Sequence, residues 1–350
     1  MTAVAPSTSS PPSAAPSVTP PSGAAPRWLT GIFLANLVAQ TAIILTGGLV
    51  RVTGSGLGCP TWPQCTEGSL VPTATQTEAW HKYVEFGNRT LTGVLGLLAI
   101  AAIVGAIVWR RRSGVRRRPI LWLSVIPLAG TVAQAVLGGI TVLTGLNPVT
   151  VALHFLLSAA IVAGTVVLVW RSREPGDQPV VRFGPPAVRV LAGVLVGVGF
   201  AVLVLGTIVT GSGPHSGDAD AASRFGFDVR TVSWLHADVV LLFVGLTVGL
   251  LVALSVTEVP RRAVRAVWWV FGISMAQGVI GYTQYFTGVP WLLVALHMLA
   301  ACLLWIALVR VPLSLRARGT VGAVKPGAAA PPLSAGTGRS RWRGRAAPDS

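Results

Sequence analysis

Long apolar runs alternate with short polar segments along this chain. Each run holds about 20 residues, which is the length of an α-helix that crosses the hydrocarbon core of a bilayer. The pattern predicts eight such helices. Their approximate ranges are 29–50, 83–109, 120–143, 150–170, 188–209, 232–254, 266–287 and 291–310.

The composition supports this prediction. Of 350 residues, 52% are hydrophobic and 11% are charged, whereas about 25% are charged in a typical soluble domain. The chain is therefore predicted to be an all-α polytopic membrane protein with membrane lipid around it. The net charge of +16 does not indicate a nucleic-acid partner, because the basic residues lie in short loops and in the C-terminal segment.

The basic residues also predict an orientation. Of the 27 Lys and Arg residues, 22 fall on one side of the predicted helices and five on the other. Because basic loops stay in the cytoplasm, we expect a multi-pass protein of the cell membrane with both termini cytoplasmic. The loops 51–82 and 210–231 then face outward.

The chain contains an internal repeat. The sequence Thr-Gly-Ser-Gly occurs at 53–56 and again at 210–213, and Val-Ala-Leu-His ends at His154 and at His297, each 20 residues after a glutamine. We therefore predict two pseudo-symmetric four-helix bundles, as in membrane proteins built from parallel repeats.

This repeat divides the chain into segments. The N-terminal bundle covers 27–172, a cytoplasmic linker covers 173–187, and the C-terminal bundle covers 188–310. Residues 1–26 are rich in Pro, Ser, Ala and Thr, and residues 311–350 form a basic tail. Both tails are predicted to be disordered, because their compositions cannot build an apolar core.

Four residues occupy equivalent positions in the even-numbered helices: Asn88, His154, His236 and His297. An imidazole in hydrocarbon is costly and is a functional hypothesis by default. One such histidine could equally serve packing by bonding to a neighbouring helix. Three at one depth favour a cofactor site.

Haem fits these positions best. His236 and His297 could face each other across a four-helix bundle and ligate one iron. His154 would face Asn88, a poor iron ligand, so that half would hold a haem with one axial position open. Zinc is a weaker alternative, because no further Cys, His or carboxylate clusters at that depth.

Polar residues near the outer boundary complete the candidate site. Glu85, one turn before Asn88, could donate a proton or orient a substrate, or it could form an ordinary i,i+4 pair with Arg89. Cys59 and Cys65 share an outer loop, where a disulfide is favoured. That disulfide could be a structural staple or a redox-active pair. Cys302, within an apolar run, is expected to be inert.

These residues resemble haem A synthase. The resemblance rests on the run from Gly47 to Cys65, which contains Thr-Gly-Ser-Gly and Cys-Pro-Thr-Trp-Pro-Gln-Cys, on Glu-Phe-Gly-Asn-Arg at 85–89, and on the histidine repeats. It covers about residues 29–310.

The resemblance implies oxidation of the C8 methyl of haem O to a formyl group, giving haem A for terminal oxidases. It implies haem b on His236 and His297, substrate haem on His154, a catalytic glutamate at Glu85 and an outer cysteine pair. It further implies haem O synthase as a partner and an electron donor that the sequence does not identify.

This chain departs from the family at Asn88, where many members carry histidine. Some members also carry a second cysteine pair between the fifth and sixth helices, where this chain has His215 and Asp218. The first departure leaves His154 as the principal ligand for substrate haem.

Two other functions compete. A b-type membrane cytochrome that only transfers electrons would need two equivalent bis-histidine sites, and Asn88 argues against this. A transporter would need broken helices or an ionisable path across the midplane, whereas the polar residues here cluster at the outer side.

Overall fold

The computed structural model describes residues 23–114, 118–176, 179–215, 217–218 and 223–318. It contains eight long α-helices, and all eight are long and apolar enough to cross a membrane, which confirms the predicted all-α polytopic membrane fold. The helices are α1 (Arg27–Val52), α2 (His81–Ser113), α3 (Arg118–Leu143), α4 (Pro148–Ser172), α5 (Pro186–Ser212), α6 (Val229–Ser255), α7 (Arg261–Phe286) and α8 (Trp291–Ser314).

The ends of the helices follow from local sequence signals. Asn147 caps α4 by accepting a hydrogen bond from the amide of Val149, and Asp228 caps α6 by accepting one from the amide of Thr231. Such caps satisfy amides that the first helical turn leaves without partners. Four other helices, α1, α5, α7 and α8, begin directly after a proline.

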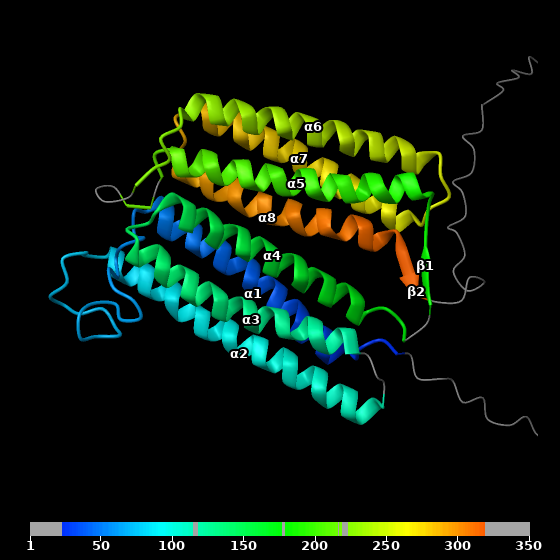
Figure 1. Ribbon diagram of the computed structural model, residues 1–350, viewed down its shortest axis with the longest axis horizontal. Coiled ribbons are helices and arrows are strands. Elements are labelled where there is room, and N and C mark those ends of the chain that lie inside the picture. Colours follow the sequence, from blue (N-terminus) through cyan, green and yellow to red (C-terminus); the bar gives the residue numbers. More distant parts are fainter. Residues whose placement is uncertain (1–22, 115–117, 177–178, 216, 219–222, 319–350) are drawn as a thin grey trace, which may run out of the picture.

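The helices form two bundles. In each bundle of four, consecutive helices pack side by side and the last packs against the first, so α1 to α4 and α5 to α8 form separate rings. The rings meet through α1, α4, α5 and α8 (Figure 1). The diagonal helices α2 and α4 have no Cα atoms within 8 Å of each other in the described chain, nor do α6 and α8.

A short antiparallel sheet joins the two halves at one end, which we call the sheet end. Strand β1 (Val180–Arg182) follows α4 and pairs with β2 (Arg316–Arg318), which follows α8. Glu174 accepts hydrogen bonds at 3.3 Å from both Arg316 and Arg318. The predicted C-terminal tail starts at residue 311, yet α8 and β2 extend through residues 311–318. The predictions of disorder at 1–22 and 319–350 lie outside the described residues.

The opposite end, which we call the loop end, carries the segment between α1 and α2 (Figure 1). Here the chain segments around the two Thr-Gly-Ser-Gly sequences are joined, because the guanidinium of Arg51 donates to the carbonyls of His215, at 2.6 Å, and Thr210, at 3.1 Å. The amide of Gly56 also donates to the carbonyl of Gly217. The halves are therefore tied at both ends.

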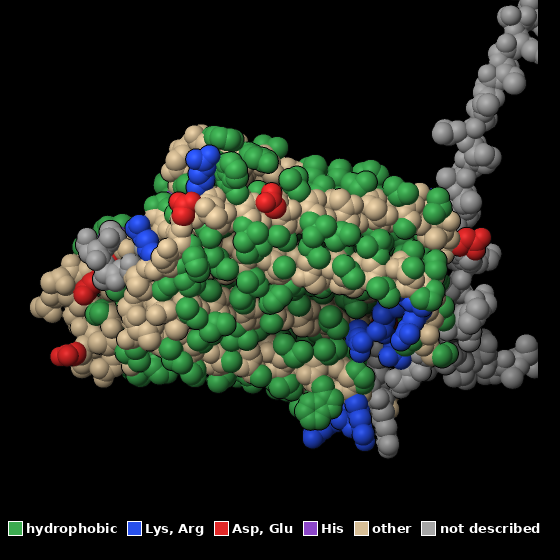
Figure 2. All heavy atoms as spheres, turned by 45° about the horizontal axis from the view of Figure 1, so that its top comes forward, with side chains coloured by type: hydrophobic (Ala, Val, Ile, Leu, Met, Phe, Trp, Pro, Cys, Tyr) green, Lys and Arg blue, Asp and Glu red, His purple; other side chains and the backbone are tan. Residues whose placement is uncertain are grey.

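The apolar core is concentrated toward the sheet end. Hydrophobic side chains cover the middle of the bundles, and charged side chains lie mainly toward the ends (Figure 2). In α6, for example, four of five buried residues follow position 242. The candidate site lies nearer to the loop end. The largest fully buried side chains include Phe33, Leu195, Phe243, Leu250 and Leu308.

Candidate functional site

The four positions singled out in the sequence are equivalent in the structure. Asn88, His154, His236 and His297 each lie six or seven residues after the first residue of their helix, near the loop end. Each histidine is half-buried. Their common depth follows from the repeat, because all four helices run in the same direction through their bundles.

Each of these side chains lies against a glycine of the preceding helix. A Cβ on that glycine would meet the ring or amide within 4 Å, so glycine allows the close approach of a bulky polar side chain to the neighbouring backbone. The pairs, with the distance from the ideal Cβ position, are Gly47 with Asn88 Nδ2 at 3.8 Å, Gly138 with His154 Cε1 at 3.1 Å, Gly206 with His236 Cε1 at 3.4 Å, and Gly281 with His297 Cε1 at 3.4 Å.

Two of the histidine helices carry a further restraint. Gln134 of α3 donates to the carbonyl of His154 at 2.9 Å, and Gln277 of α7 donates to the carbonyl of His297 at 3.0 Å. Each glutamine lies one turn before the glycine behind the same histidine. The glutamines therefore fix the backbone of α4 at His154 and the backbone of α8 at His297. In α5 the corresponding residue is Val202, which has no side chain for such a bond.

The C-terminal bundle contains two of the histidines. His236 and His297 lie on the diagonal helices α6 and α8, each with its ring against a glycine of the preceding helix. The Nδ1 atom of His297 is buried and makes no hydrogen bond within the described residues, and the same is true of His154. A buried imidazole nitrogen without a hydrogen-bond partner is costly. Two imidazoles at one depth on diagonal helices, each backed by a glycine, form a donor set that could hold a haem.

Asn88 differs from the histidines in chemistry and in contacts. Its Oδ1 accepts a hydrogen bond of 2.7 Å from the hydroxyl of Thr46 on α1. The amide is therefore held against α1. In the N-terminal bundle, His154 is the one imidazole among the two equivalent positions.

Glu85 forms the i,i+4 pair that the sequence offered as its ordinary role. Its Oε1 accepts from Arg89 Nη2 at 2.5 Å and Nε at 3.0 Å, and its Oε2 accepts from the amide of Cys59 at 2.5 Å. The residue is 5% exposed. Glu85 therefore bonds to the loop between α1 and α2 as well as to Arg89.

The loop between α1 and α2 contains the expected disulfide between Cys59 and Cys65. Both cysteines are buried. Arg89 donates to three carbonyls of the loop, those of Cys59 at 2.7 Å, Thr61 at 3.0 Å and Gln64 at 3.1 Å. The disulfide loop thus surrounds the guanidinium of Arg89. Cys302 is free and buried, as expected for an inert core residue.

The remaining two histidines have structural partners. His81 Nδ1 lies 2.8 Å from the hydroxyl of Ser55, and His215 Nε2 lies 2.9 Å from the carbonyl of Val289. Within the described residues, no three His, Cys, Asp or Glu side chains come together as a metal site.

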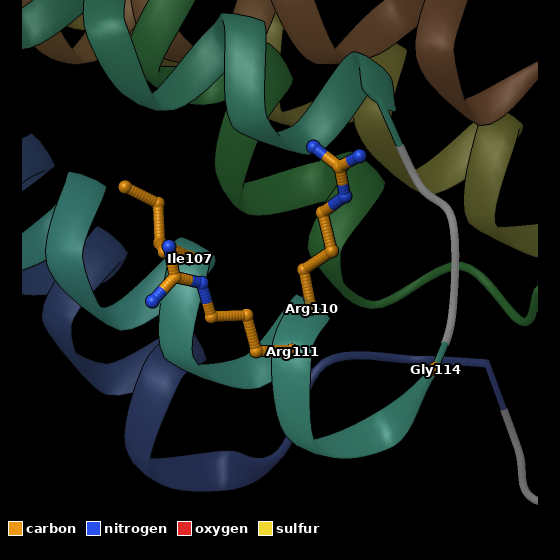
Figure 3. A pocket seen from close by; sticks show the side chains of 4 residues that line it. All are labelled: Ile107, Arg110, Arg111 and Gly114. Carbon is orange, nitrogen blue, oxygen red and sulfur yellow. The ribbon is translucent and has the colours of Figure 1, made fainter.

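A hollow with basic residues lies at the other end of the molecule. It is lined by Ile107, Arg110, Arg111 and Gly114 at the sheet end of α2 (Figure 3). None of the candidate ligands contributes to it. Its location fits the basic side of the protein rather than the site of chemistry.

Sequence reasoning missed several residues that position the site. Gly138 and Gly281 each precede their histidine by 16 residues and follow their glutamine by four, so this repeat could have been found. Arg51 left no such signal, because its hydrogen bonds join segments that are distant in the sequence.

A comparison with protein families adds an independent observation. The profile of the cytochrome oxidase assembly protein family COX15-CtaA matches residues 27–309, which include all eight helices except the last residues of α8. The chain belongs to this family. The match covers both bundles, so the histidine positions of both halves lie inside it.

Curated relatives match this chain to different extents. Proteins named "Heme A synthase" from Lysinibacillus sphaericus and Halalkalibacterium halodurans are 34% and 31% identical, over 41% and 45% of this chain and 44% and 48% of their own. A "Protoheme IX farnesyltransferase" of Thermus thermophilus is 26% identical over 91% of this chain and 54% of its own. The chain thus spans about half the length of the curated relatives that it matches.

The disulfide loop yields a direct prediction. In protein purified without reductant, denatured and treated with an alkylating reagent, Cys302 should be labelled, whereas Cys59 and Cys65 should be recovered in one linked peptide pair by mass spectrometry. After reduction, all three should be labelled. Labelling of Cys59 and Cys65 before reduction would contradict the pairing.

Proposed function

We propose that this chain is a haem A synthase, which oxidises the C8 methyl of haem O to a formyl group and so gives haem A for terminal oxidases. One observation carries the proposal: three of four equivalent glycine-backed positions hold histidine and the fourth holds asparagine. Membership of a cytochrome oxidase assembly family and relatives named for haem A synthesis support it.

The C-terminal bundle would hold haem b as a resident cofactor between His236 and His297. The equivalent depth of the two rings in their helices and the glycines behind them support this assignment. When bound there, haem b supplies a one-electron carrier. The chain itself orients the imidazoles, with Gln277 restraining the backbone of His297. The tightly packed core on the sheet side excludes water beneath the site.

The N-terminal bundle would bind substrate haem through His154. Gln134 holds the carbonyl of His154, and the Gln134 side chain also donates to Ser158. Asn88 is engaged by Thr46 and is a poor ligand for iron, so His154 would be the principal protein ligand in this half. One strong ligand would suit a haem that must enter, react and leave.

Glu85 would be the catalytic carboxylate of the N-terminal half. It lies about one helical turn outward from Asn88. Hydrogen bonds from Arg89 and from the amide of Cys59 fix both carboxylate oxygens. A carboxylate held in this way can accept a proton or orient a polar edge of the substrate without further reorganisation.

The cellular setting is also part of the proposal. The basic sheet end would face the cytoplasm and the disulfide loop would face outward across the cell membrane, in accord with the distribution of Lys and Arg. The farnesyltransferase relative contains a segment similar to this chain in just over half of its length. We therefore propose that the substrate, a farnesylated haem, comes from haem O synthase by direct contact. An electron donor is also required.

The function can be tested by extracting and identifying the haems of the purified protein and of two variants. Wild type should contain haem B together with haem O or haem A. Glu85→Gln and His154→Ala should each lower haem A formation at least about tenfold while retaining haem B, because a positioned acid or base contributes roughly 10²–10⁴-fold. His154→Ala should also lower the content of haem O.

The haem content and the rate of haem A formation distinguish the proposed enzyme from a cytochrome. Haem B alone, at two per chain, would favour the b-type cytochrome. Undiminished haem A formation by both variants would show that the N-terminal bundle is not the reaction site. Asp228→Asn, at an exposed helix cap, serves as a control that should leave haem A formation unchanged.

The resident haem site gives a second prediction. His236→Ala and His297→Ala should each abolish the low-spin absorption spectrum, because a bis-histidine iron needs both ligands. Gly281→Val should weaken the same spectrum by pushing the ring of His297, whereas Gly278→Val, on the same helix with nothing within 4 Å, should not. A normal spectrum in both histidine variants would refute the assignment.

A further inference from the structure

The disulfide loop reaches past α2 and contacts α3 beside His154. The ring of Trp62 lies against Gly139, where a Cβ would meet Trp62 Cε2 at 2.7 Å and Cγ at 2.8 Å. The preceding residue, Gly138, is the glycine behind His154. Two consecutive glycines of α3 therefore contact the loop tryptophan and the candidate substrate ligand.

The same loop is attached firmly to α2. Arg89 holds the carbonyls of Cys59, Thr61 and Gln64, and Glu85 holds the amide of Cys59. The disulfide closes the loop around these contacts. The position of Trp62 is thereby fixed relative to α2, the helix that carries Glu85.

A continuous set of contacts thus joins the two helices of the N-terminal site. Helices α2 and α4 are diagonal and have no Cα atoms within 8 Å of each other in the described chain. Their connection at the loop end runs from Glu85 and Arg89 through the loop to Trp62, then through α3 to His154. The C-terminal bundle differs, because the residue after its α7 glycine is Tyr282 and not a second glycine.

We propose that Trp62 is a positioning residue, which sets the distance between Glu85 and His154 by packing against Gly139 at the outer end of α3. The inference rests on the proposed function, since it assigns the bound haem to the His154 site. Trp62 is 38% exposed, so its contact with α3 is a surface contact that substitution can remove without opening the buried core.

The measurement is the rate at which added haemin leaves the full-length detergent-purified protein for excess apomyoglobin. His154→Ala identifies the phase that belongs to the N-terminal site. Trp62→Ala should speed this phase about tenfold, because an aromatic packing contact has about that effect on an equilibrium. Trp62→Phe should restore the rate to within about threefold of wild type. The low-spin absorption spectrum assigned to the C-terminal haem should be unchanged in Trp62→Ala and in Trp62→Phe.

A second pair of variants keeps the tryptophan. Gly139→Ala should displace the ring of Trp62 and speed the same phase, whereas Gly96→Ala, on α2 with nothing within 4 Å, should have no effect. Trp80→Ala is the matched tryptophan control, because Trp80 is 54% exposed and stacks on His81.

With haem O as substrate, Trp62→Ala should raise KM more than it lowers kcat.

The haem-release rates distinguish the positioning role of Trp62 from the assignment of substrate haem to His154. A His154-dependent phase that keeps its rate in Trp62→Ala and Gly139→Ala would overturn the positioning role and leave the proposed function standing. Absence of any phase that His154→Ala alters would overturn the assignment of substrate haem to this half, and the role of Trp62 with it. Equal acceleration by Trp80→Ala would show general loosening of the loop and would also overturn the role.

Discussion

The close approach of an imidazole to a glycine of the neighbouring helix is the interaction on which the candidate site depends. A histidine inside a membrane bundle needs space for its ring and a fixed direction, and lipid offers no polar partner for it. Glycine supplies the space because it has no Cβ. The pairs Gly138–His154, Gly206–His236 and Gly281–His297 repeat this solution at one depth.

The two bundles share this framework but differ in what they add to it. The C-terminal bundle places two histidines on diagonal helices, which suits a permanently held cofactor. The N-terminal bundle replaces one histidine with Asn88 and binds the amide to Thr46. It also gains a disulfide loop anchored on Arg89. Under the proposed function, the bundle with one histidine and the disulfide loop would bind the molecule that is present only during the reaction.

The sequence was sufficient to predict the helices, the repeat and the depth of the histidines, because these features follow from local hydropathy and from spacing along the chain. It predicted the Cys59–Cys65 disulfide as well. The contact of Trp62 with Gly139 and the bonds of Arg51 across the halves could not be predicted, since no periodic pattern relates segments so far apart. Glu85 shows an intermediate case: the sequence offered the pair with Arg89, but the bond from the amide of Cys59 required the fold.

The strongest test of this account is the number of bis-histidine haems per chain, measured by electron paramagnetic resonance with spin quantitation against protein concentration. We predict one for the wild type and two for Asn88→His, because that substitution places an imidazole opposite His154, whereas Asn88→Ala should stay at one. Two bis-histidine haems in the wild type, or no gain in Asn88→His, would contradict the claim that Asn88 separates an open site from a closed one.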